Sequence, residues 1–448
     1  MGMVLSHEMT LLKEPSGVLL RRRRVANPDP VFLLHPIEAA VLALLDGVRN
    51  LAEVSDIIRK IFMISPEAAE RVSARVVDRF WQFLVDREDL SNPNEIRICD
   101  LEELIYRPAP REASSRGAAP ASLTLVITKS CPRRCLYCGT AAEYASAPVP
   151  GVLPLAKWKS IIDQAADVGV SRLELTGGEP FLRQDIFEVL EYVGRKRFRR
   201  IDLMTKYSLD EDSVVRLKGL KGLTVQVGLD SADRRTNDLL TGSKGSFDEL
   251  VRSLELLAKH RVESQVITVV TRHNFQQLSI LGVLLESVGA ASVCFSECKR
   301  SLYRDCGSLS LDYSQREHAK REIAVIRSRG RFRNVASDFE EKNSGCSRGR
   351  TSLAILDDGA AAVCHGAAEK SDELRVGDLK IQSIMEVWLS PALKEIISPD
   401  RERFRGTACH GCSNLDSCNV RGRCFYQALY LNGKIFSSDQ ACPVVGCL

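Results

Sequence analysis

The sequence predicts an α/β protein built on a parallel sheet, with a small α+β domain before it and a cysteine-rich domain after it. Strand-like and helix-like runs alternate through the middle of the chain, and eight of the fifteen cysteines come after residue 330. The 448 residues allow about two to four domains. The predicted domains are residues 1–92, a linker at 93–121, the sheet domain at 122–330 and the cysteine-rich domain at 331–448.

The first domain begins with two strand-like runs, Gly17–Val25 and Val31–Leu34, which three amphipathic helical stretches follow. Asn50 with Glu53 predicts a capping box at the start of the second helix. Ser65, followed by a proline, predicts the N-cap of the third. Strands followed by three such helices indicate a winged-helix-like domain.

Residues 93–121 are rich in Pro, Ala, Ser and Gly, which is typical of a flexible linker. After it, six strand-like runs alternate with amphipathic helices and predict a parallel sheet. The runs are Leu123–Thr128, Arg172–Thr176, Arg200–Thr205, Leu223–Leu229, Gln265–Val270 and Ala291–Phe295. Functional groups are expected at the carboxyl ends of these strands.

Two motifs follow the first two strands. Cys131, Cys135 and Cys138 have the spacing C-x3-C-x2-C, and Gly177-Gly178-Glu179-Pro180 comes about forty residues later. Three thiolates suit an iron–sulfur cube and leave one iron without a protein ligand. The alternative is a zinc knuckle, but a closed zinc site needs a fourth ligand and no histidine stands at zinc-finger spacing nearby.

At these residues the chain resembles the radical S-adenosylmethionine (radical SAM) enzymes. The resemblance implies a partial (β/α)6 barrel of TIM type and a [4Fe-4S] cluster. This cluster passes one electron to bound SAM and so generates a 5′-deoxyadenosyl radical. A flavodoxin- or ferredoxin-type protein is the expected electron donor. The residues that the resemblance places around SAM are Tyr137, Gly177, Gly178, Glu179, Pro180, Thr205 and Asp230.

Three of these positions carry specific expectations. Glu179 resembles the acidic residue near the SAM amino group, and the two preceding glycines let the backbone approach the ligand closely. Asp230 resembles the residue that reaches the ribose hydroxyls, with a helix N-cap as the alternative. Lys206 follows Thr205 where many relatives carry Asn, so its role stays open.

The cysteines near the carboxyl terminus resemble a SPASM domain, which carries two auxiliary iron–sulfur clusters. By family correspondence a nearer set consists of Cys346, Cys364 and Cys424, and a distal set consists of Cys409, Cys412, Cys418 and Cys442. The family spacing of three residues before Cys424 is five here, which predicts a small insertion. Zinc in the distal set is the alternative. With the radical SAM cluster, three clusters are expected.

The nearer set is one ligand short, because Tyr426 stands where the related crosslinking enzymes have a second cysteine. Either one iron is open to the substrate, or Cys298, Cys306 or Cys447 supplies the ligand. His365, next to Cys364, is the candidate for taking a substrate proton. The alternative is that His365 only donates or accepts a hydrogen bond beside the cluster.

Residues 33–54 and 76–85 resemble the leader-binding domains of ribosomally made peptide pathways, and the whole chain is most similar to the peptide-crosslinking enzymes of pyrroloquinoline quinone synthesis. The implied partner is a precursor peptide whose leader adds a strand to a sheet edge. The run Arg21–Arg24 would make one such edge basic and favour an acidic leader. The alternative is that these arginines form a solvated face.

The expected function is therefore a maturase that binds a leader peptide and oxidatively crosslinks the core through C–C, C–S or C–N bonds. A peptide epimerase or sulfatase-type protein maturase is the alternative, and an iron–sulfur DNA-binding redox sensor a remote one. A net charge of +4 argues for neither a nucleic-acid nor a membrane partner, and no apolar run approaches 18 residues. Cysteines at ligand-like spacing without an evident signal peptide predict a reducing cytoplasm.

Overall fold

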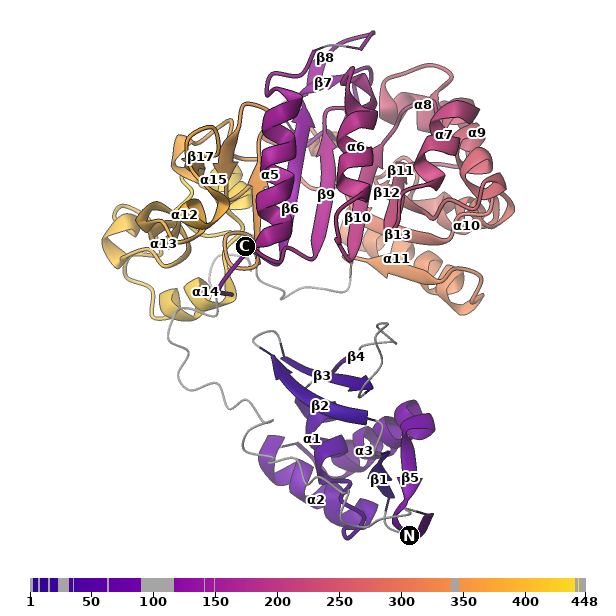
Figure 1. Cartoon of the computed structure of the whole chain (residues 1–448), viewed down its shortest axis with the longest axis vertical. Coiled ribbons are helices and arrows are strands. Elements are labelled where there is room, and N and C mark those ends of the chain that lie inside the picture. Colours follow the sequence, from indigo (N-terminus) through magenta and orange to yellow (C-terminus); the bar gives the residue numbers. More distant parts are fainter. Residues whose placement is uncertain are drawn as a thin grey trace. The chain divides into compact units, whose positions relative to one another are not determined.

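The chain forms two compact units, Met1–Ser115 and Arg116–Leu448 (Figure 1). This computed structural model describes residues 3–6, 9–14, 17–22, 32–34, 36–62, 64–89, 117–140, 142–148, 150–339, 346–439 and 442. Most of the predicted linker therefore lies outside the described residues, as do Cys447 and the second half of the run Arg21–Arg24. No helix in the described ranges has the length and apolar character needed to cross a membrane.

The first unit combines a three-stranded antiparallel sheet with three helices (Figure 1). The sheet has the order β2 (Met9–Glu14), β3 (Gly17–Arg22), β4 (Phe32–Leu34), and β1 (Met3–Leu5) pairs with β5 (Leu84–Asp86). The helices are α1 (Pro36–Leu44), α2 (Leu51–Phe62) and α3 (Pro66–Phe80). Leu20, Val41, Ile58 and Phe80 bring β3 and the three helices into one buried core.

The predicted helix starts of this unit are confirmed. The backbone N–H of Asn50 donates to Glu53 Oε2 at 2.8 Å, and the N–H of Glu53 donates to Asn50 Oδ1 at 3.0 Å, which completes the capping box. Ser65 Oγ accepts a hydrogen bond from the N–H of Ala68 at 3.2 Å and caps α3. Strand β2 was not expected from the sequence.

Half of the arginine run lies on β3. Arg21 and Arg22 end this strand and pair with Thr10 and Met9 of β2, whereas the described pairing of β3 with β4 covers only residues 18–20. The expectation that the run makes a sheet edge basic therefore stays a prediction. Arg23 and Arg24 lie outside the described residues.

The second unit is built on a ten-stranded sheet (Figure 1). Its six central strands are adjacent in chain order and parallel: β6 (Ser122–Thr128), β9 (Arg172–Gly177), β10 (Arg200–Thr205), β11 (Leu223–Gly228), β12 (Ser264–Val270) and β13 (Ser292–Glu297). These are the six predicted strands. The predicted α/β fold class is thus confirmed, and the mostly parallel sheet is consistent with a partial TIM barrel.

The same sheet takes strands from beyond residue 330. β14 (Asn334–Ser337) pairs in parallel with β13, and β15 (Ser352–Ile355) pairs in parallel with β6. β16 (Ala360–Ala362) and β17 (Arg375–Asp378) continue it in antiparallel fashion. One buried core joins the strands to helices on both sides of residue 330 and includes Trp158 and Trp388. The cysteine-rich segment is therefore packed onto the sheet.

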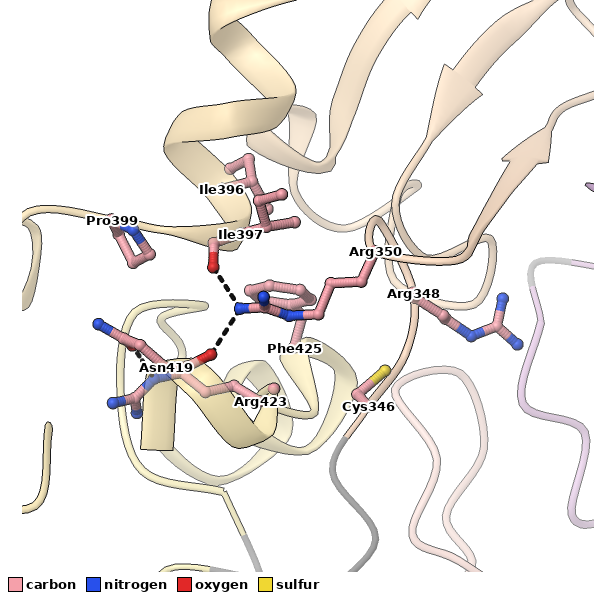
Figure 2. Close-up of a pocket in the computed structure, with 10 residues that line it drawn as sticks. Cys346, Arg348, Arg350, Ile396, Ile397, Pro399, Asn419, Arg423 and Phe425 are labelled. Carbon is pink, nitrogen blue, oxygen red and sulfur yellow. Dashed lines mark hydrogen bonds between the residues drawn. The ribbon is translucent and has the colours of Figure 1, made fainter. Parts of the chain in front are cut away.

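Helices follow the strands of the second unit. They are α5 (Leu155–Asp167), α6 (Ile186–Gly194), α7 (Glu211–Lys218), α8 (Arg234–Thr241), α9 (Ser246–Lys259), α10 (Leu278–Ser287), α11 (Tyr313–Ser328), α12 (Ile384–Trp388), α13 (Pro391–Ile397), α14 (Leu415–Arg421) and α15 (Phe425–Asn432). Arg350 joins two of them, because its buried guanidinium donates to the carbonyls of Ile397 and Asn419 at 2.5 Å each (Figure 2). This contact fixes α13 against α14.

Candidate functional site

The three cysteines of the first motif lie in the loop after β6. Cys131 ends the short strand β7 (Ser130–Cys131), which pairs with β8 (Glu143–Tyr144), and Cys135 and Cys138 follow. Burial and, to a smaller extent, the nearby Glu179, Cys135 and Cys138 together raise the pKa of Cys131 to about 12. The three thiols are thus close together at the carboxyl end of a parallel strand. This donor set fits an iron–sulfur cluster, whose binding would release the thiol protons.

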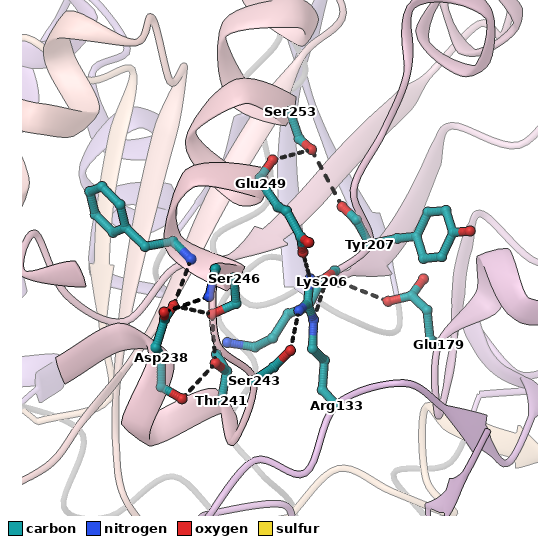
Figure 3. A network of polar contacts seen from close by, with 12 residues as sticks. Arg133, Glu179, Lys206, Tyr207, Asp238, Thr241, Ser243, Ser246, Glu249 and Ser253 are labelled. Carbon is teal, nitrogen blue, oxygen red and sulfur yellow. Dashed lines mark hydrogen bonds and ion pairs between the residues drawn. The ribbon is translucent and has the colours of Figure 1, made fainter. Parts of the chain in front are cut away.

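A buried arginine holds this loop in place. Arg133 donates to the carbonyl of Lys206 at 3.2 and 3.1 Å, to Ser243 Oγ at 2.7 Å and to Glu249 Oε2 at 2.5 Å (Figure 3). It therefore links the cysteine loop to the end of β10 and to α9. Nothing in the sequence distinguishes Arg133 from its exposed neighbour Arg134, so it was missed.

The two glycines of the second motif pack against the backbone that leads into Cys131. A Cβ atom on Gly177, whose φ is +145°, would lie 2.1 Å from the carbonyl oxygen of Thr128. A Cβ atom on Gly178 would lie 2.2 Å from that of Ser130. Only glycine fits such close approach of two backbones. The structure thus gives these glycines a role in chain packing, which is separate from the approach to a ligand expected from the sequence.

Glu179 is buried between the ends of β9 and β10. Its Oε1 accepts hydrogen bonds from Thr205 Oγ1 at 2.7 Å and from the N–H of Phe181 at 3.2 Å, and its Oε2 accepts one from the N–H of Lys206 at 2.8 Å. Burial outweighs these bonds and raises the pKa of Glu179 to about 7. The carboxyl group can therefore ionise when an ammonium group arrives. Pro180, also buried, begins the 3-10 turn that follows.

Tyr137, Lys206 and Asp230 form one polar cluster. Lys206 Nζ lies 2.7 Å from Asp230 Oδ2 and 2.8 Å from Tyr137 Oη, and the phenol of Tyr137 also donates to Asp230. Burial alone would lower the pKa of Lys206, but the charge and hydrogen bond of Asp230, together with the nearby Cys135, leave it raised. The N-cap of α8 is Asp233. The alternative interpretation of Asp230 as a helix cap is therefore wrong.

The cysteines of the nearer set lie in one neighbourhood. Burial and, to a smaller extent, the nearby Cys346 and Cys364 together raise the pKa of Cys424 to about 11. Gly422 allows the chain to pass close to Cys346, since its φ is +88° and a Cβ atom there would lie 2.2 Å from the carbonyl oxygen of Cys346. Segments that are far apart in the sequence thus bring these three cysteines near one another.

His365 contacts an arginine beside this set. Arg348 Nη1 lies 3.2 Å from His365 Nδ1, so the guanidinium donates and Nδ1 accepts. Burial and, to a smaller extent, the charge of Arg348 together lower the pKa of His365 to about 3. A neutral imidazole with Nδ1 already occupied favours the hydrogen-bonding alternative over proton removal.

Tyr426 connects the nearer set to the first cysteine loop. Its Oη accepts a hydrogen bond from the N–H of Leu302 at 2.8 Å and lies 3.3 Å from Ser301 Oγ. Ser301 in turn donates to the carbonyl of Cys138 at 2.7 Å. Tyr426 is thus held by contacts with the segment after β13.

Cys298 and Cys306 are the described candidates for the fourth ligand of the nearer set. Both lie near the loop of Cys131, Cys135 and Cys138. Cys298 and Cys306 are buried with Leu240 and Leu309, and Cys306 Sγ donates to the carbonyl of Leu136 at 3.3 Å. Both thiols belong to this small apolar cluster, which packs against Tyr137. The contacts therefore favour a packing role for them.

The distal set lines one hollow, which contains Cys409, Cys412, Cys418 and Cys442. Across the part of the chain that the structure describes, no three His, Cys, Asp or Glu side chains converge on a single metal-ion position. An iron–sulfur cluster in this hollow, with zinc as the alternative, therefore stays a prediction.

Two family models match the second unit. Residues 125–281 match the radical SAM superfamily, and residues 346–413 match the SPASM iron–sulfur cluster-binding domain. The chain is a radical SAM enzyme with a SPASM domain. The first match spans β6 to α10, including Cys131, Cys135 and Cys138, and the second spans the segment from Cys346 through Cys412.

Solved structures share the fold of this radical SAM enzyme. Streptococcus suis SuiB bound to its precursor peptide SuiA has a TM-score of 0.62 at 18% identity, covering 98% of this chain and 100% of that one. SuiB bound to S-adenosylmethionine has the same TM-score at 16% identity and the same coverage. anSMEcpe with bound AdoMet has a TM-score of 0.55 at 18% identity, covering 72% of this chain and 94% of that one. The shared architecture extends over nearly the whole of SuiB.

Proposed function

We propose that this radical SAM enzyme binds the leader of a ribosomally synthesised precursor peptide with its first unit and oxidatively crosslinks the core with its second. The observation that carries the proposal is the fold shared with SuiB, which is solved with a precursor peptide and matches 98% of this chain, so that both units are included. anSMEcpe, also solved with a bound peptide, matches 72% of the chain.

The first unit offers a site for an extended peptide. Among its described strands, β2 and β4 each pair only with β3, so each has one free edge. A free edge presents unpaired N–H and C=O groups to which a peptide can add as a further strand. The leader would therefore bind at β2 or β4, with the neighbouring helices supplying side-chain contacts.

The second unit offers residues for each cofactor. Cys131, Cys135 and Cys138 would hold the radical SAM cluster, Glu179 would receive the amino group of SAM, and Asp230 the ribose hydroxyls. Bound at these residues, the first cluster and SAM would supply the radical that takes a hydrogen atom from the core peptide. The auxiliary clusters would then accept the electron that the peptide loses. Crosslinking removes two hydrogen atoms from the peptide, one as an atom and one as this electron and a proton.

Mass spectrometry of a precursor peptide encoded beside the gene tests the proposal after anaerobic incubation with SAM and a reductant. Crosslinking would remove two hydrogen atoms from the peptide. Unchanged mass with deuterium uptake would indicate epimerisation instead, and an unmodified peptide would overturn the proposal. A core peptide without its leader should react roughly tenfold more slowly, because the tethering by the first unit is lost.

Two cysteine variants serve as controls for the chemistry. Cys135→Ala should abolish 5′-deoxyadenosine formation, since it removes a ligand of the first cluster. Cys412→Ala should retain part of this activity but yield no crosslinked peptide, because it affects only the distal set. Full product from Cys412→Ala would remove the auxiliary clusters from the proposal.

A further inference from the structure

Arg423 is a buried arginine between the two auxiliary cysteine sets. Only 6% of its surface is exposed, and the next residue is Cys424 of the nearer set. Its side chain lines the hollow of the distal set and also a second hollow of about 250 Å³ beside Cys346 (Figure 2). Arg423 therefore lines the hollow of the distal set and a hollow beside one cysteine of the nearer set.

The guanidinium of Arg423 is fixed on three sides. Its Nε donates to Asn419 Oδ1 at 2.9 Å, its Nη1 donates to the carbonyl of Ser437 at 3.1 Å, and its Cζ lies 4.5 Å from the ring centre of Phe404. These contacts come from residues that are not cluster ligands. They hold the charged group at one position whether or not a cluster is present.

The remaining donors of Arg423 have no ordinary partners. Nη1 lies 3.6 Å from Cys409 Sγ, which is within the range of a hydrogen bond to sulfur. Nη2 is buried, and none of the described residues accepts a hydrogen bond from it. A buried charged donor without a partner is costly, so such groups in native proteins usually face a ligand or an ion. Here the adjacent hollow is lined by four cysteines.

We propose that Arg423 donates hydrogen bonds to the distal iron–sulfur cluster, through Nη1 to the Cys409 thiolate and through Nη2 to a sulfur inside the hollow, and so raises its reduction potential. The reason is electrostatic: reduction adds negative charge, which a buried cation and its N–H donors stabilise. The proposal rests on the distal set holding a cluster, and it does not depend on the peptide substrate.

The test is a redox titration, followed by electron paramagnetic resonance, of anaerobically reconstituted full-length protein carrying Cys131→Ala, Cys135→Ala and Cys138→Ala. This background keeps both auxiliary sets and needs no turnover. Arg423→Met should lower the potential of the distal cluster enough to change its reduced fraction at least tenfold, which is about 59 mV for one electron. Arg423→Lys should lower it less, because the charge stays and the planar fork is lost.

Arg183→Met is the matched control. Arg183 is also a buried arginine but lines neither hollow, so its loss should leave the distal potential unchanged. An unchanged potential in Arg423→Met, an equal shift in Arg183→Met, or zinc in place of iron in the distal set would each overturn the proposal. If Arg423→Met does not retain distal iron, Arg423→Lys decides: a lowered potential supports the proposal and an unchanged one overturns it.

Discussion

Ser301 Oγ donates a hydrogen bond of 2.7 Å to the carbonyl oxygen of Cys138, the last cysteine of the radical SAM motif. Ser301 Oγ also accepts hydrogen bonds from the N–H groups of Tyr303 and Arg304 at 3.0 and 3.2 Å, and Tyr426 Oη lies 3.3 Å from it. One buried hydroxyl thus ties the first cysteine loop to the segment after β13 and to helix α15.

Ser301→Ala should therefore loosen the loop of Cys138. The change leaves one carbonyl and two N–H groups without their partner, which should cost about 1–3 kcal/mol of stability. We expect roughly tenfold slower formation of 5′-deoxyadenosine, since small displacements of a reacting group reduce rates strongly. Ser287→Ala, which removes a similar bond of 2.7 Å on the exposed face of α10, should change neither quantity. Equal behaviour of the two variants would contradict this prediction.

Lys206→Met should destabilise the protein before any cofactor binds. It leaves the fully buried carboxylate of Asp230 without its cation, and breaking a buried pair costs about 3–5 kcal/mol. Urea unfolding of the metal-free protein measures the loss. The double variant Lys206→Met with Asp230→Asn should be clearly more stable than the sum of the two single effects implies. Additive effects would show that the two side chains are not coupled.

Gly178→Ala should prevent the second motif from packing on the cysteine loop. Its new methyl group would meet the carbonyl oxygens of Ser130 and Lys129 at 2.2 and 2.4 Å, so one backbone must move. We expect a loss of about 3 kcal/mol in thermal or urea unfolding, at the upper end of overpacking effects. Gly219→Ala, with the nearest atom 3.8 Å away, should be neutral within about 0.5 kcal/mol. A harmless Gly178→Ala would mean that the loop yields easily.

The sheet and both cysteine motifs could be predicted from the sequence because they depend on local patterns. Continuous apolar runs such as Leu123–Thr128 indicate strands buried on both faces, and ligand spacing within one loop is visible directly. The sequence also predicted that Glu179 and Thr205 belong to the site. Glu179 follows β9 and Thr205 ends β10. Because β9 and β10 are neighbouring parallel strands, their carboxyl ends, and with them these two residues, lie side by side.

Contacts between distant residues could not be predicted in this way. Arg133 contacts Glu249, which is 116 positions later, and Ser301 contacts Cys138, which is 163 positions earlier. Only the folded chain brings these residues together, because many other polar residues of the sequence have similar neighbours and could equally have been chosen as partners. For Arg21 and Arg22 the local strand was predicted, but its place in the middle of the sheet depends on β2, which the sequence did not indicate.

Cys306→Ala should leave the iron content of the auxiliary sites unchanged. The Cys306 thiol is buried with Cys298 and donates to the carbonyl of Leu136, so it packs beside the radical SAM loop. Iron analysis of the reconstituted variant should match the unaltered protein, whereas Cys346→Ala should lose iron from the nearer set. A comparable loss in Cys306→Ala would identify Cys306 as the missing fourth ligand.

The affinity for SAM should depend on pH through Glu179. Burial raises the pKa of this carboxyl group to about 7, so in the free protein it is protonated below pH 7 and ionised above it. The amino group of SAM carries a positive charge and favours the ionised form, which means that binding below pH 7 must release the proton. Affinity should therefore rise by up to about tenfold per pH unit as pH approaches 7, and fall again above about pH 8, where the amino group of SAM loses its proton.

Equilibrium binding of SAM to the reconstituted protein between pH 6 and pH 8.5 measures this dependence. Glu179→Gln should bind SAM more weakly at every pH and lose the rise in affinity toward pH 7, because the amide neither titrates nor carries charge. Thr205→Val removes the 2.7 Å hydrogen bond that stabilises the ionised carboxylate, so it should move the rise in affinity to higher pH. An affinity that is flat with pH in the unaltered protein would show that the Glu179 carboxyl group does not receive the amino group of SAM.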